Sequence, residues 1–281
     1  MKIFHTKKEL QSDLQDLRDQ NKIITLIPTM GALHEGHLSL INFAKPKSDV
    51  TICSIFVNPT QFNDPKDLEK YPRPIEKDIA LLESVGCDYL FLPSVEEMYP
   101  KDDTPWHIDL GDLDQIWEGE KRPGHFQGVT QIVYKLFNLI KPQQACFGQK
   151  DFQQVMVIQK MIDILKLPIQ LLICPTVRSD KGLALSSRNE RLSPEGKEKA
   201  LLLSKALFHI KVNFNNKDIS TLLKEGTAIL NEDPAIEIEY LTICESSTLK
   251  PIDKIKEGNS YIALVVAWVE NVRLIDNVIL K

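Results

Sequence analysis

Five short, predominantly apolar runs occur in the first 175 residues, and segments with helical periodicity separate them. The runs cover residues 22–28, 50–57, 89–92, 145–147 and 169–174. A strand without alternating polar residues has both faces buried, which is typical of a parallel sheet with helices on each side. Strands that alternate with helices build such sheets from βαβ units. We therefore predict a doubly wound parallel α/β domain, Rossmann-like in architecture.

Local signals mark the ends of the predicted helices. Thr6 followed by Glu9 is a capping box at the start of the first amphipathic helix. Pro74 opens another helix and Gly86 follows its end, the two positions that favour these residues. Two more helices are expected over residues 127–140 and 152–165, between apolar runs, as βαβ units require.

The pattern changes after Pro175. Two amphipathic helices, in the sequences SPEGKEKALLLSKAL and DISTLLKEGTAIL, precede a strand in IEIEYLTI. The segment YIALVVAWVENVRLIDNVIL is typical of a hairpin that turns near Glu270 and Asn271. Helices followed by antiparallel strands indicate a smaller α+β domain. We therefore expect two domains, over residues 1–176 and 177–281.

The composition excludes several classes of protein. The 281 residues are 43% hydrophobic and 26% charged, ordinary values for a globular chain. A net charge of −5 argues against broad binding to nucleic acid. The 5 cysteines are scattered and form no CxxC pair, so free buried thiols in a reducing compartment are expected.

No segment favours a membrane location. The N-terminal sequence MKIFHTKKELQSDL has no apolar core of signal-peptide length. The most apolar later stretch, residues 263–269, is far shorter than the about 20 residues of a membrane span. We expect a cytoplasmic protein with neither a membrane nor a nucleic-acid partner.

Polar residues follow four of the predicted strands, at the edge where parallel α/β sheets bind ligands. After the first run comes PTMGALHEGH, in which His34 and His37 are three residues apart. That spacing predicts both imidazoles on one face of the first turn of a helix, where they join free backbone amides in binding phosphate. Metal binding is the other interpretation, although no third ligand is evident.

Neutral amides and one charged pair follow two other strands. Asn58 and Gln61 come after the second run and can hold a hydroxyl or a carboxylate without adding charge. The sequence FGQKDFQQ follows the fourth run, and its Lys150 can reach a phosphate as a point charge. Asp151 can take a ribose hydroxyl or a metal ion. Gln154 is expected on the same helical face as Lys150, one turn later.

The last cluster is Ser186-Ser187-Arg188, after the fifth run. Hydroxyl donors beside a guanidinium suit a triphosphate. Ser193, which precedes Pro194, already provides the N-cap of the next helix, and this weakens a capping explanation for the two serines.

The combined chemistry of these clusters favours activation of an acid by ATP. Two histidines, a lysine and an arginine are predicted to surround a phosphate-sized site, with three amides beside it. No Ser-His-Asp arrangement or reactive cysteine context is evident, so a covalent enzyme intermediate is not expected. Transfer at phosphorus instead needs stabilisation of charge, which these cations supply.

Six motifs occur in a specific order and spacing: PTMGALHEGH, VNPTQF, YPR, RPGHFQGV, FGQKDFQQ and ALSSRN. In this the chain resembles the pantothenate synthetase (pantoate–β-alanine ligase) family over essentially its whole length. That family belongs to the nucleotidyl-transferase superfamily with an HxGH motif. The resemblance implies a Rossmann-like domain that binds ATP and pantoate over residues 1–176, and a lid domain over 177–281.

The resemblance implies ATP-dependent condensation of pantoate with β-alanine through pantoyl adenylate, releasing AMP and pyrophosphate. It assigns catalysis to His34, His37, Lys150 and Arg188, with His37 as proton donor. It assigns pantoate to Gln61 and Gln154, with Gln61 also near β-alanine. We further expect Asn58 and His125 to help to orient the amine. The residues implied for ATP are Met30, Gly31, Ala32, Leu33, His34, Glu35, Gly36, His37, Gly148, Gln149, Lys150, Asp151, Val177, Leu185, Ser186, Ser187 and Arg188.

The resemblance also implies Mg²⁺, held mainly by ATP itself, and a homodimer formed through the N-terminal domain. Asp78 is the candidate protein ligand to the metal, although Lys77 beside it thins the acidic cluster. The family commonly has glutamate where Gln149 stands and methionine where Leu185 stands. Neither side chain is needed to bind phosphate, so we expect only slight changes in substrate affinity and no change in the reaction.

Two other functions stay open at this point. An adenylyltransferase shares the HxGH-type site but leaves AMP on its product, and a non-catalytic module binds ATP without consuming it. A tRNA ligase is disfavoured, because the acidic chain shows no basic surface for a polyanion.

Overall fold

The computed structural model describes residues 1–281 and divides into two compact units. The first unit comprises residues 1–148 and 153–174, and the second comprises residues 149–152 and 175–281. The principal change of unit falls two residues before the boundary expected at 176/177. The short segment 149–152 belongs to the second unit although first-unit residues flank it on both sides.

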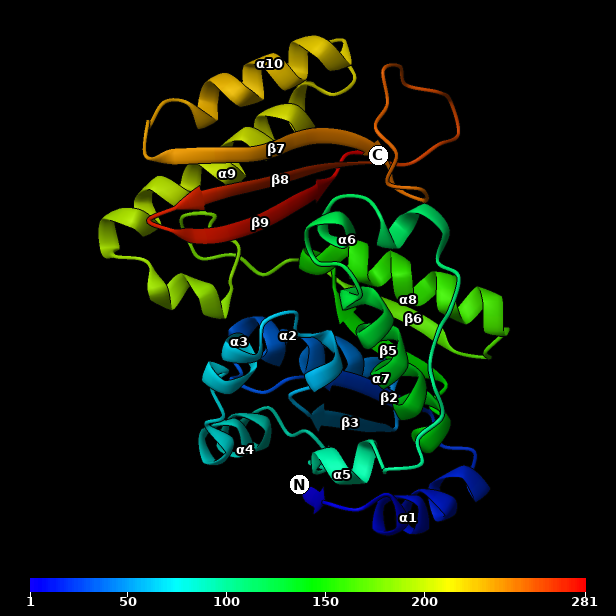
Figure 1. Cartoon of the computed structure of the whole chain (residues 1–281). Coiled ribbons are helices and arrows are strands. Elements are labelled where there is room, and N and C mark those ends of the chain that lie inside the picture. Colours follow the sequence, from blue (N-terminus) through cyan, green and yellow to red (C-terminus); the bar gives the residue numbers. More distant parts are fainter. The chain divides into compact units, whose positions relative to one another are not determined.

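The first unit is built on a six-stranded parallel sheet (Figure 1). Its strand order is β1-β4-β3-β2-β5-β6. The bounds are β1 Lys2–Phe4, β2 Ile24–Thr29, β3 Val50–Ile55, β4 Tyr89–Phe91, β5 Gln144–Gly148 and β6 Gln170–Cys174. The order runs outward from β2 in one direction and from β5 in the other, so the neighbours β2 and β5 mark the switch point of a doubly wound sheet. The predicted fold class is confirmed.

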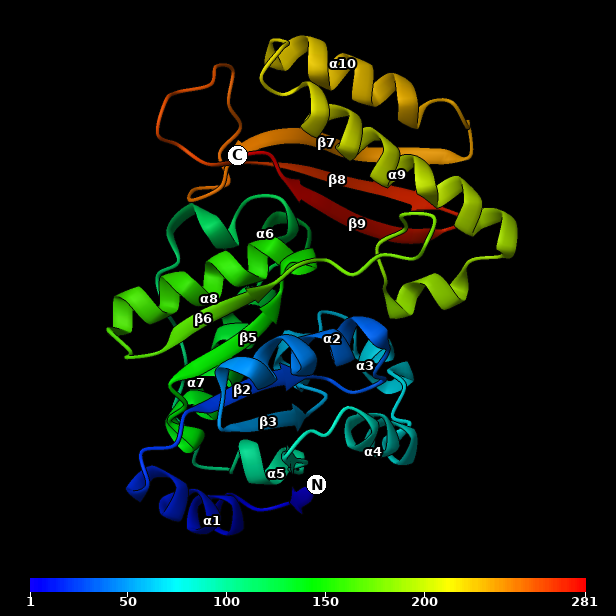
Figure 2. The ribbon, with the colours of Figure 1, turned by 180° about the vertical axis from the view of Figure 1, so that it is seen from behind.

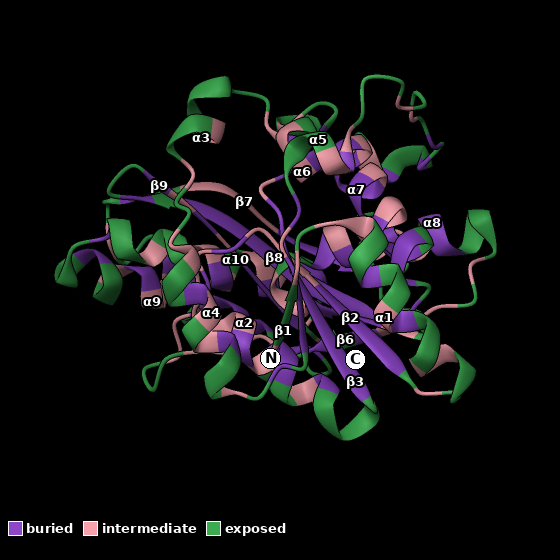
Figure 3. Ribbon diagram, turned by 90° about the horizontal axis from the view of Figure 1, so that it is seen from below, coloured by how far each residue is buried: buried purple, intermediate pink, exposed green.

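Helices cover both faces of this sheet. Helices α2 (Glu35–Ala44) and α4 (Ile75–Ser84) share one core with the sheet, which includes Ile41 and Leu82 from the helices and Ile27 and Cys53 from the strands. Helix α7 (His125–Ile140) covers the opposite face from α2, as the two opposed views in Figures 1 and 2 show. The strands β2 and β3 are therefore buried along most of their length (Figure 3).

Most predicted elements of the first unit are present. Helix α1 (Lys7–Asp19) starts with the predicted capping box: Thr6 accepts the Glu9 backbone N–H, and the Glu9 carboxylate accepts the Thr6 N–H. Helix α8 covers Phe152–Leu165, as predicted. The short elements β1, α3 (Pro65–Lys70), α5 (Val95–Met98) and α6 (Glu118–Lys121) were not predicted, because three to six residues carry too little periodicity.

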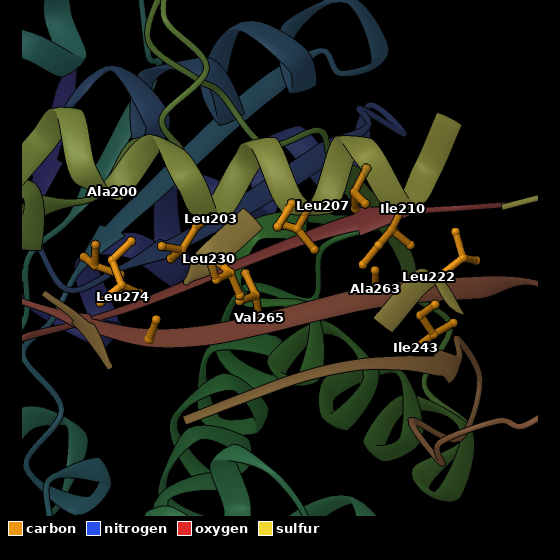
Figure 4. Close-up of a cluster of buried hydrophobic side chains, with 14 of the residues drawn as sticks. Ala200, Leu203, Leu207, Ile210, Leu222, Leu230, Ile243, Ala263, Val265 and Leu274 are labelled. Carbon is orange, nitrogen blue, oxygen red and sulfur yellow. The ribbon is translucent and has the colours of Figure 1, made fainter. Parts of the chain in front are cut away.

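The second unit packs two helices on a three-stranded antiparallel sheet, which confirms the predicted α+β architecture. Its elements are α9 Pro194–Asn213, α10 Ile219–Leu230, β7 Ile236–Glu245, β8 Tyr261–Val269 and β9 Val272–Ile279. Figure 4 shows Leu203, Leu207 and Ile210 of α9 directed at the sheet, where Ala263 and Val265 of β8 complete the core. The expected N-cap of α9 is present, since Ser193 accepts the Gly196 N–H at 2.9 Å.

The hairpin β8–β9 turns where the sequence predicted. Val269 pairs with Val272, so the loop contains only Glu270 and Asn271. Both loop residues have positive φ, 49° and 62°, the backbone that a tight turn between twisted antiparallel strands requires. This tight connection fixes the register of β9 and hence the positions of Asp276 and Asn277.

All five cysteines are free and buried, as expected. Burial raises the pKa of each thiol above its ordinary value, so none is a ready nucleophile at neutral pH. Among the helices of the chain, none combines the length and the apolar character needed to cross a lipid bilayer.

Candidate functional site

The loop between β2 and α2 has an unusual backbone. Gly31 and Ala32 both lie in the left-handed region, with φ values of 79° and 51°. A Cβ atom on Gly31 would lie 2.9 Å from Ile55 Cγ2 and 3.0 Å from an oxygen of Asp78, so only glycine fits there. The turn brings the chain directly from the end of the buried strand to the first turn of α2.

Asp78, on α4, holds this loop in place. One carboxylate oxygen accepts the Ala32 backbone N–H at 2.8 Å, and the other accepts the Leu33 N–H at 2.7 Å. The side chain is fully buried, at 0% exposure. Two charge-assisted hydrogen bonds to consecutive amides fix the backbone that leads into His34.

This geometry differs from the expectation that Asp78 assists a metal ion. Both carboxylate oxygens already accept backbone N–H groups, and the residue has no exposed surface. Across the whole chain, no group of three or more His, Cys, Asp or Glu side chains has a spacing suited to a metal ion. We therefore assign Asp78 to the β2–α2 loop and not to a metal ion.

His34 and His37 lie together, 4.2 Å apart between ring centroids. They do not both project from the helix as predicted: His34 is the extended N-cap residue, and α2 begins at Glu35. The His34 Nδ1 accepts the Gly36 N–H at 3.1 Å, and the His37 Nδ1 accepts the His34 N–H at 3.3 Å. In each neutral ring the proton is consequently on Nε2, which makes that nitrogen a hydrogen-bond donor.

The Gln61 side chain is set by a buried amide pair. Asn58 donates from Nδ2 to Gln61 Oε1 at 3.1 Å and to the Gly128 carbonyl at 3.0 Å. Its Oδ1 accepts hydrogen bonds from Tyr99 at 2.7 Å and from Thr60 at 3.1 Å. All four hydrogen-bonding positions of Asn58 are thus occupied within the protein, and only 1% of the residue is exposed. Asn58 positions Gln61 in this structure.

Helix α7 also supports the turn that carries Gln61. The Nδ1 of His125 donates to the Gln61 main-chain carbonyl at 2.9 Å, and Arg122 lies 3.2 Å from the other ring nitrogen. Tyr99, which the sequence analysis did not single out, is the remaining support, and burial raises its pKa to about 12. Its hydroxyl is therefore protonated at neutral pH and serves as a donor to Asn58.

Two further predicted residues of the first unit are Gly148 and Gln154. Gln154 is half-buried near the start of α8, and it directly follows the buried Gln153. Gln153 donates to the carbonyls of Leu113 and Ile116, both at 2.8 Å, which anchors this end of α8. A Cβ atom added at Gly148 would meet only Leu40, at 3.8 Å, so there is room for alanine at this position.

Lys150 lies outside α8, contrary to the predicted shared helical face with Gln154. It belongs to the short 3-10 helix η4 (Gln149–Asp151), and η4 is part of the second unit. The Lys150 side chain is 19% exposed, whereas Asp151 is 54% exposed, with 3.9 Å between their charged atoms. Lys150 is therefore held close to protein, and Asp151 reaches toward solvent.

The second unit contains a small pocket that brings together several predicted residues. Lys150, Ser186 and Arg188 line it, together with Arg273, Asp276 and Asn189. Arg273 was not predicted: a single arginine on a strand of a hairpin carries no sequence signal for a ligand. Its charge is balanced by Glu239, at 2.8 and 2.9 Å. The pocket thus combines cationic and hydroxyl groups that can bind a polyanion.

The loop that carries Ser186 and Arg188 is internally braced. Leu185 donates its N–H to the Val177 carbonyl at 2.9 Å, and Asn189 donates to the Ala184 carbonyl at 2.9 Å. Ser186 is the N-cap of the 3-10 helix η5 (Ser187–Arg191) and accepts the Arg188 N–H at 3.3 Å. A capping role for Ser186 was not expected from the sequence, because η5 was not predicted, and that expectation was wrong. Ser187 and Arg188 are exposed.

A larger depression in the first unit, of about 620 Å³, is lined by Trp106, Tyr134 and Lys135 among others. None of the predicted site residues lines it. Many of the predicted residues instead lie in two places, at the β2–α2 loop with the Gln61 turn and in the pocket of the second unit. Gln154, on α8, lies in neither.

The doubly wound sheet and the His34-x-Gly36-His37 sequence after β2 define an α/β protein with an HxGH motif. The family model for pantoate-beta-alanine ligase matches residues 2–279. The chain belongs to the pantoate-beta-alanine ligase family.

Individual relatives agree with this assignment. A pantothenate synthetase from Bacteroides fragilis is 45% identical over 278 residues, which cover 99% of this chain and 98% of the relative. The crystal structure of pantothenate synthetase from Thermus thermophilus matches with a TM-score of 0.91 and 40% identity over 99% of both chains. The pantoate-beta-alanine ligase from Francisella tularensis, solved with beta-gamma ATP and beta-alanine, matches with a TM-score of 0.79 and 35% identity over 99% of this chain and 97% of that one.

Proposed function

We propose that the chain joins pantoate to β-alanine by way of pantoyl adenylate. The carboxylate of pantoate attacks the α-phosphorus of ATP and displaces pyrophosphate. The amine of β-alanine then attacks the acyl carbon, so that the amide bond of pantothenate forms and AMP leaves. The ligation follows from family membership over residues 2–279, and this is the observation that carries the proposal. The intermediate fits a site with no activated protein nucleophile.

We assign the phosphates of ATP in part to the β2–α2 loop. The Nε2–H groups of His34 and His37 and the amide end of α2 provide donors for charge that develops on phosphate oxygen. We propose His37 as the proton donor in this step. The remaining loop residues implied for ATP, from Met30 to Gly36, supply backbone and shape.

Gln61 and Gln154 are the proposed pantoate ligands. A neutral amide can bind the hydroxyl and carboxylate groups of pantoate without adding charge near the triphosphate. Because Asn58 and His125 are occupied with the Gln61 turn, we propose that they act through Gln61 in orienting pantoate and β-alanine.

We assign the triphosphate also to the pocket of the second unit. Lys150 and Arg188 supply charge, and Ser186 supplies a hydroxyl, for the pyrophosphate that leaves. The exposed Ser187, next in the chain, is the proposed second hydroxyl donor. Asp151, exposed beside Lys150, is the proposed ribose ligand, and Gln149, Val177 and Leu185 complete the nucleotide contacts. The first unit then serves as the catalytic domain and the second as a lid that contributes cations.

Three accompanying features complete the proposal. Mg²⁺ enters with ATP and is held by its phosphates, since the chain has no ligand cluster of its own. The protein forms a homodimer through the first unit. Light scattering after gel filtration tests the dimer by measuring the molar mass in solution. The five free thiols fit the reducing conditions of the cytoplasm.

Product analysis tests the reaction most directly. Purified protein is mixed with ATP, Mg²⁺, pantoate and β-alanine, and we expect pantothenate, AMP and pyrophosphate in equal amounts. An adenylated final product would instead identify an adenylyltransferase, and ATP binding without turnover would identify a binding module. Isotope exchange between pyrophosphate and ATP should need pantoate alone. Exchange that required β-alanine would exclude a free adenylate.

A further inference from the structure

Two consecutive residues of β9 hold the two segments that carry Lys150 and Arg188 in the second-unit pocket. Asp276 and Asn277 are 5% and 2% exposed, although both are polar and lie in a strand. Neighbouring residues of a strand point to opposite faces of the sheet. Each of the two therefore meets a different partner, and buried polar groups of this kind are costly unless they are fully hydrogen-bonded.

Asn277 holds the turn that carries Lys150. Its Nδ2 donates to the main-chain carbonyl of Lys150 at 2.8 Å and to that of Gln149 at 3.0 Å. Its Oδ1 accepts the Gln149 side-chain N–H at 3.1 Å. Both N–H donors of the carboxamide therefore bind main-chain carbonyls of η4. One carbonyl precedes the Cα atom of Lys150 and the other follows it.

Asp276 holds the other segment through Arg178. The guanidinium of Arg178 donates to the two carboxylate oxygens of Asp276, at 2.6 and 2.8 Å. Arg178 also donates to the carbonyls of Gly182 and Asn277, at 3.1 and 3.2 Å. A buried bidentate pair of this geometry fixes the start of the loop that ends in Ser186 and Arg188.

We propose that Asn277 is a positioning residue for the ligase reaction, which sets the place of Lys150 in the phosphate pocket while Asp276 and Arg178 hold the facing loop. This inference rests on the proposed phosphate-binding role of Lys150. A lysine side chain is long and flexible, so its ammonium is placed reproducibly only when its backbone is fixed. The two donors of Asn277 provide that fixation from a strand whose register is set by the tight β8–β9 turn.

Asn277→Asp tests the proposal, because it keeps the size of the side chain and replaces the two donors with an acceptor. We expect it to raise KM for ATP and to slow pyrophosphate exchange by about tenfold to a hundredfold, the loss expected when a catalytic group is displaced by a remote change. KM for β-alanine should stay unchanged. Asn213→Asp is the matched control, since Asn213 also donates to one main-chain carbonyl, that of His209 at 2.9 Å, and does not line the pocket.

A double-mutant cycle separates positioning of Lys150 from a general structural effect. In a Lys150→Ala background, Asn277→Asp should cost less than about twofold, because the group that it displaces is already gone. Thermal unfolding of each variant shows that the protein is folded. If Asn277→Asp does not fold, Asn277→Ser replaces it, since serine is neutral and keeps one donor.

Two results would contradict the positioning role of Asn277 alone, and a third would contradict the proposed role of Lys150 as well. Normal ATP kinetics in Asn277→Asp, alongside an impaired Lys150→Ala, would overturn the positioning role and leave the proposed function intact. Equal losses from Asn277→Asp in both backgrounds would also overturn it, since Asn277 would then act by another route. Near-normal turnover of Lys150→Ala would overturn the proposed role of Lys150, and the inference with it.

Discussion

The backbone of Gly128 lies directly against the main-chain carbonyl of Thr60. A Cβ atom added at Gly128 would be 2.3 Å from that oxygen, far closer than such atoms approach. The same glycine accepts a hydrogen bond from Asn58 through its own carbonyl. Helix α7 and the Gln61 turn (η2, Pro59–Gln61) are therefore fitted to each other at a single residue without a side chain.

Gly128→Ala should displace the Gln61 turn. The clash is with backbone and cannot be relieved by a rotamer change, so we expect a loss of about 3 kcal/mol in the free energy of unfolding, at the upper end of the range for overpacking. KM for pantoate should also rise, because Gln61 moves. Urea denaturation and steady-state kinetics measure both effects. Asn138→Ala, at an exposed position of the same helix, is the control, and equal stability of the two variants would contradict the prediction.

Asp78→Asn should impair the β2–α2 loop. One of the two buried N–H groups loses its acceptor and meets an N–H₂ group instead, which costs about 1–3 kcal/mol of stability. Activity should fall with it, because the loop leads into His34. Unfolding by urea and turnover are the measurements.

Titration with Mg²⁺ distinguishes this role from metal binding. If Asp78 acts only on the loop, raising the Mg²⁺ concentration should not restore the activity of Asp78→Asn. Restoration would show that Asp78 does assist the metal. Glu76→Gln, on the exposed side of the same helix, should behave like the parent protein.

His37→Ala and Lys150→Ala should each lower kcat by on the order of a hundredfold or more. Removal of one well-placed donor to a transition state typically costs about 3 kcal/mol. Folding should be retained, because both side chains are partly exposed. Circular dichroism checks the fold and pantothenate formation measures the rate. Near-normal turnover in either variant would refute the role proposed for that residue.

Tyr99→Phe should change how stability depends on alkaline pH. The folded-state pKa of Tyr99 is raised to about 12, above the about 10 of an unfolded tyrosine. The stabilisation from its protonated hydroxyl is therefore fully present below about pH 10 and is lost as pH rises through about 12. Parent and variant should differ by about 1 kcal/mol at neutral pH, the value of one hydrogen bond.

Urea denaturation of both proteins from pH 7 to 11 measures this difference. The advantage of the parent over Tyr99→Phe should stay constant up to about pH 10 and then shrink. A difference that does not change up to pH 11 would mean that Tyr99 titrates normally. Groups common to both proteins cancel in the comparison.

The sequence predicted the architecture because its main signals are local. Apolar runs and capping residues such as Thr6 and Ser193 act over a few residues, and they gave the parallel sheet, the long helices and the β8–β9 turn. The segment 149–152 could not be assigned in the same way, because its membership of the second unit depends on Asn277, more than 120 residues away.

The site was predicted in its residue types more than in its geometry. The spacing of His34 and His37 brought the two rings together correctly, but it could not show that His34 caps the helix from outside. The family resemblance implied Asp78 as a metal ligand, whereas its burial comes from the contact of α4 with the β2–α2 loop. Tyr99 and Arg273 left no local signal, since each acts through tertiary contacts.

The five inaccessible sulfur atoms make the chain a convenient host for chemical labels. A cysteine introduced at an exposed position, such as Glu76 in the first unit or Lys197 in the second, would be the only readily ionised thiol of each unit. A donor and an acceptor dye attached at those two positions would report, without removal of any native cysteine, whether the distance between the units changes when nucleotide is added.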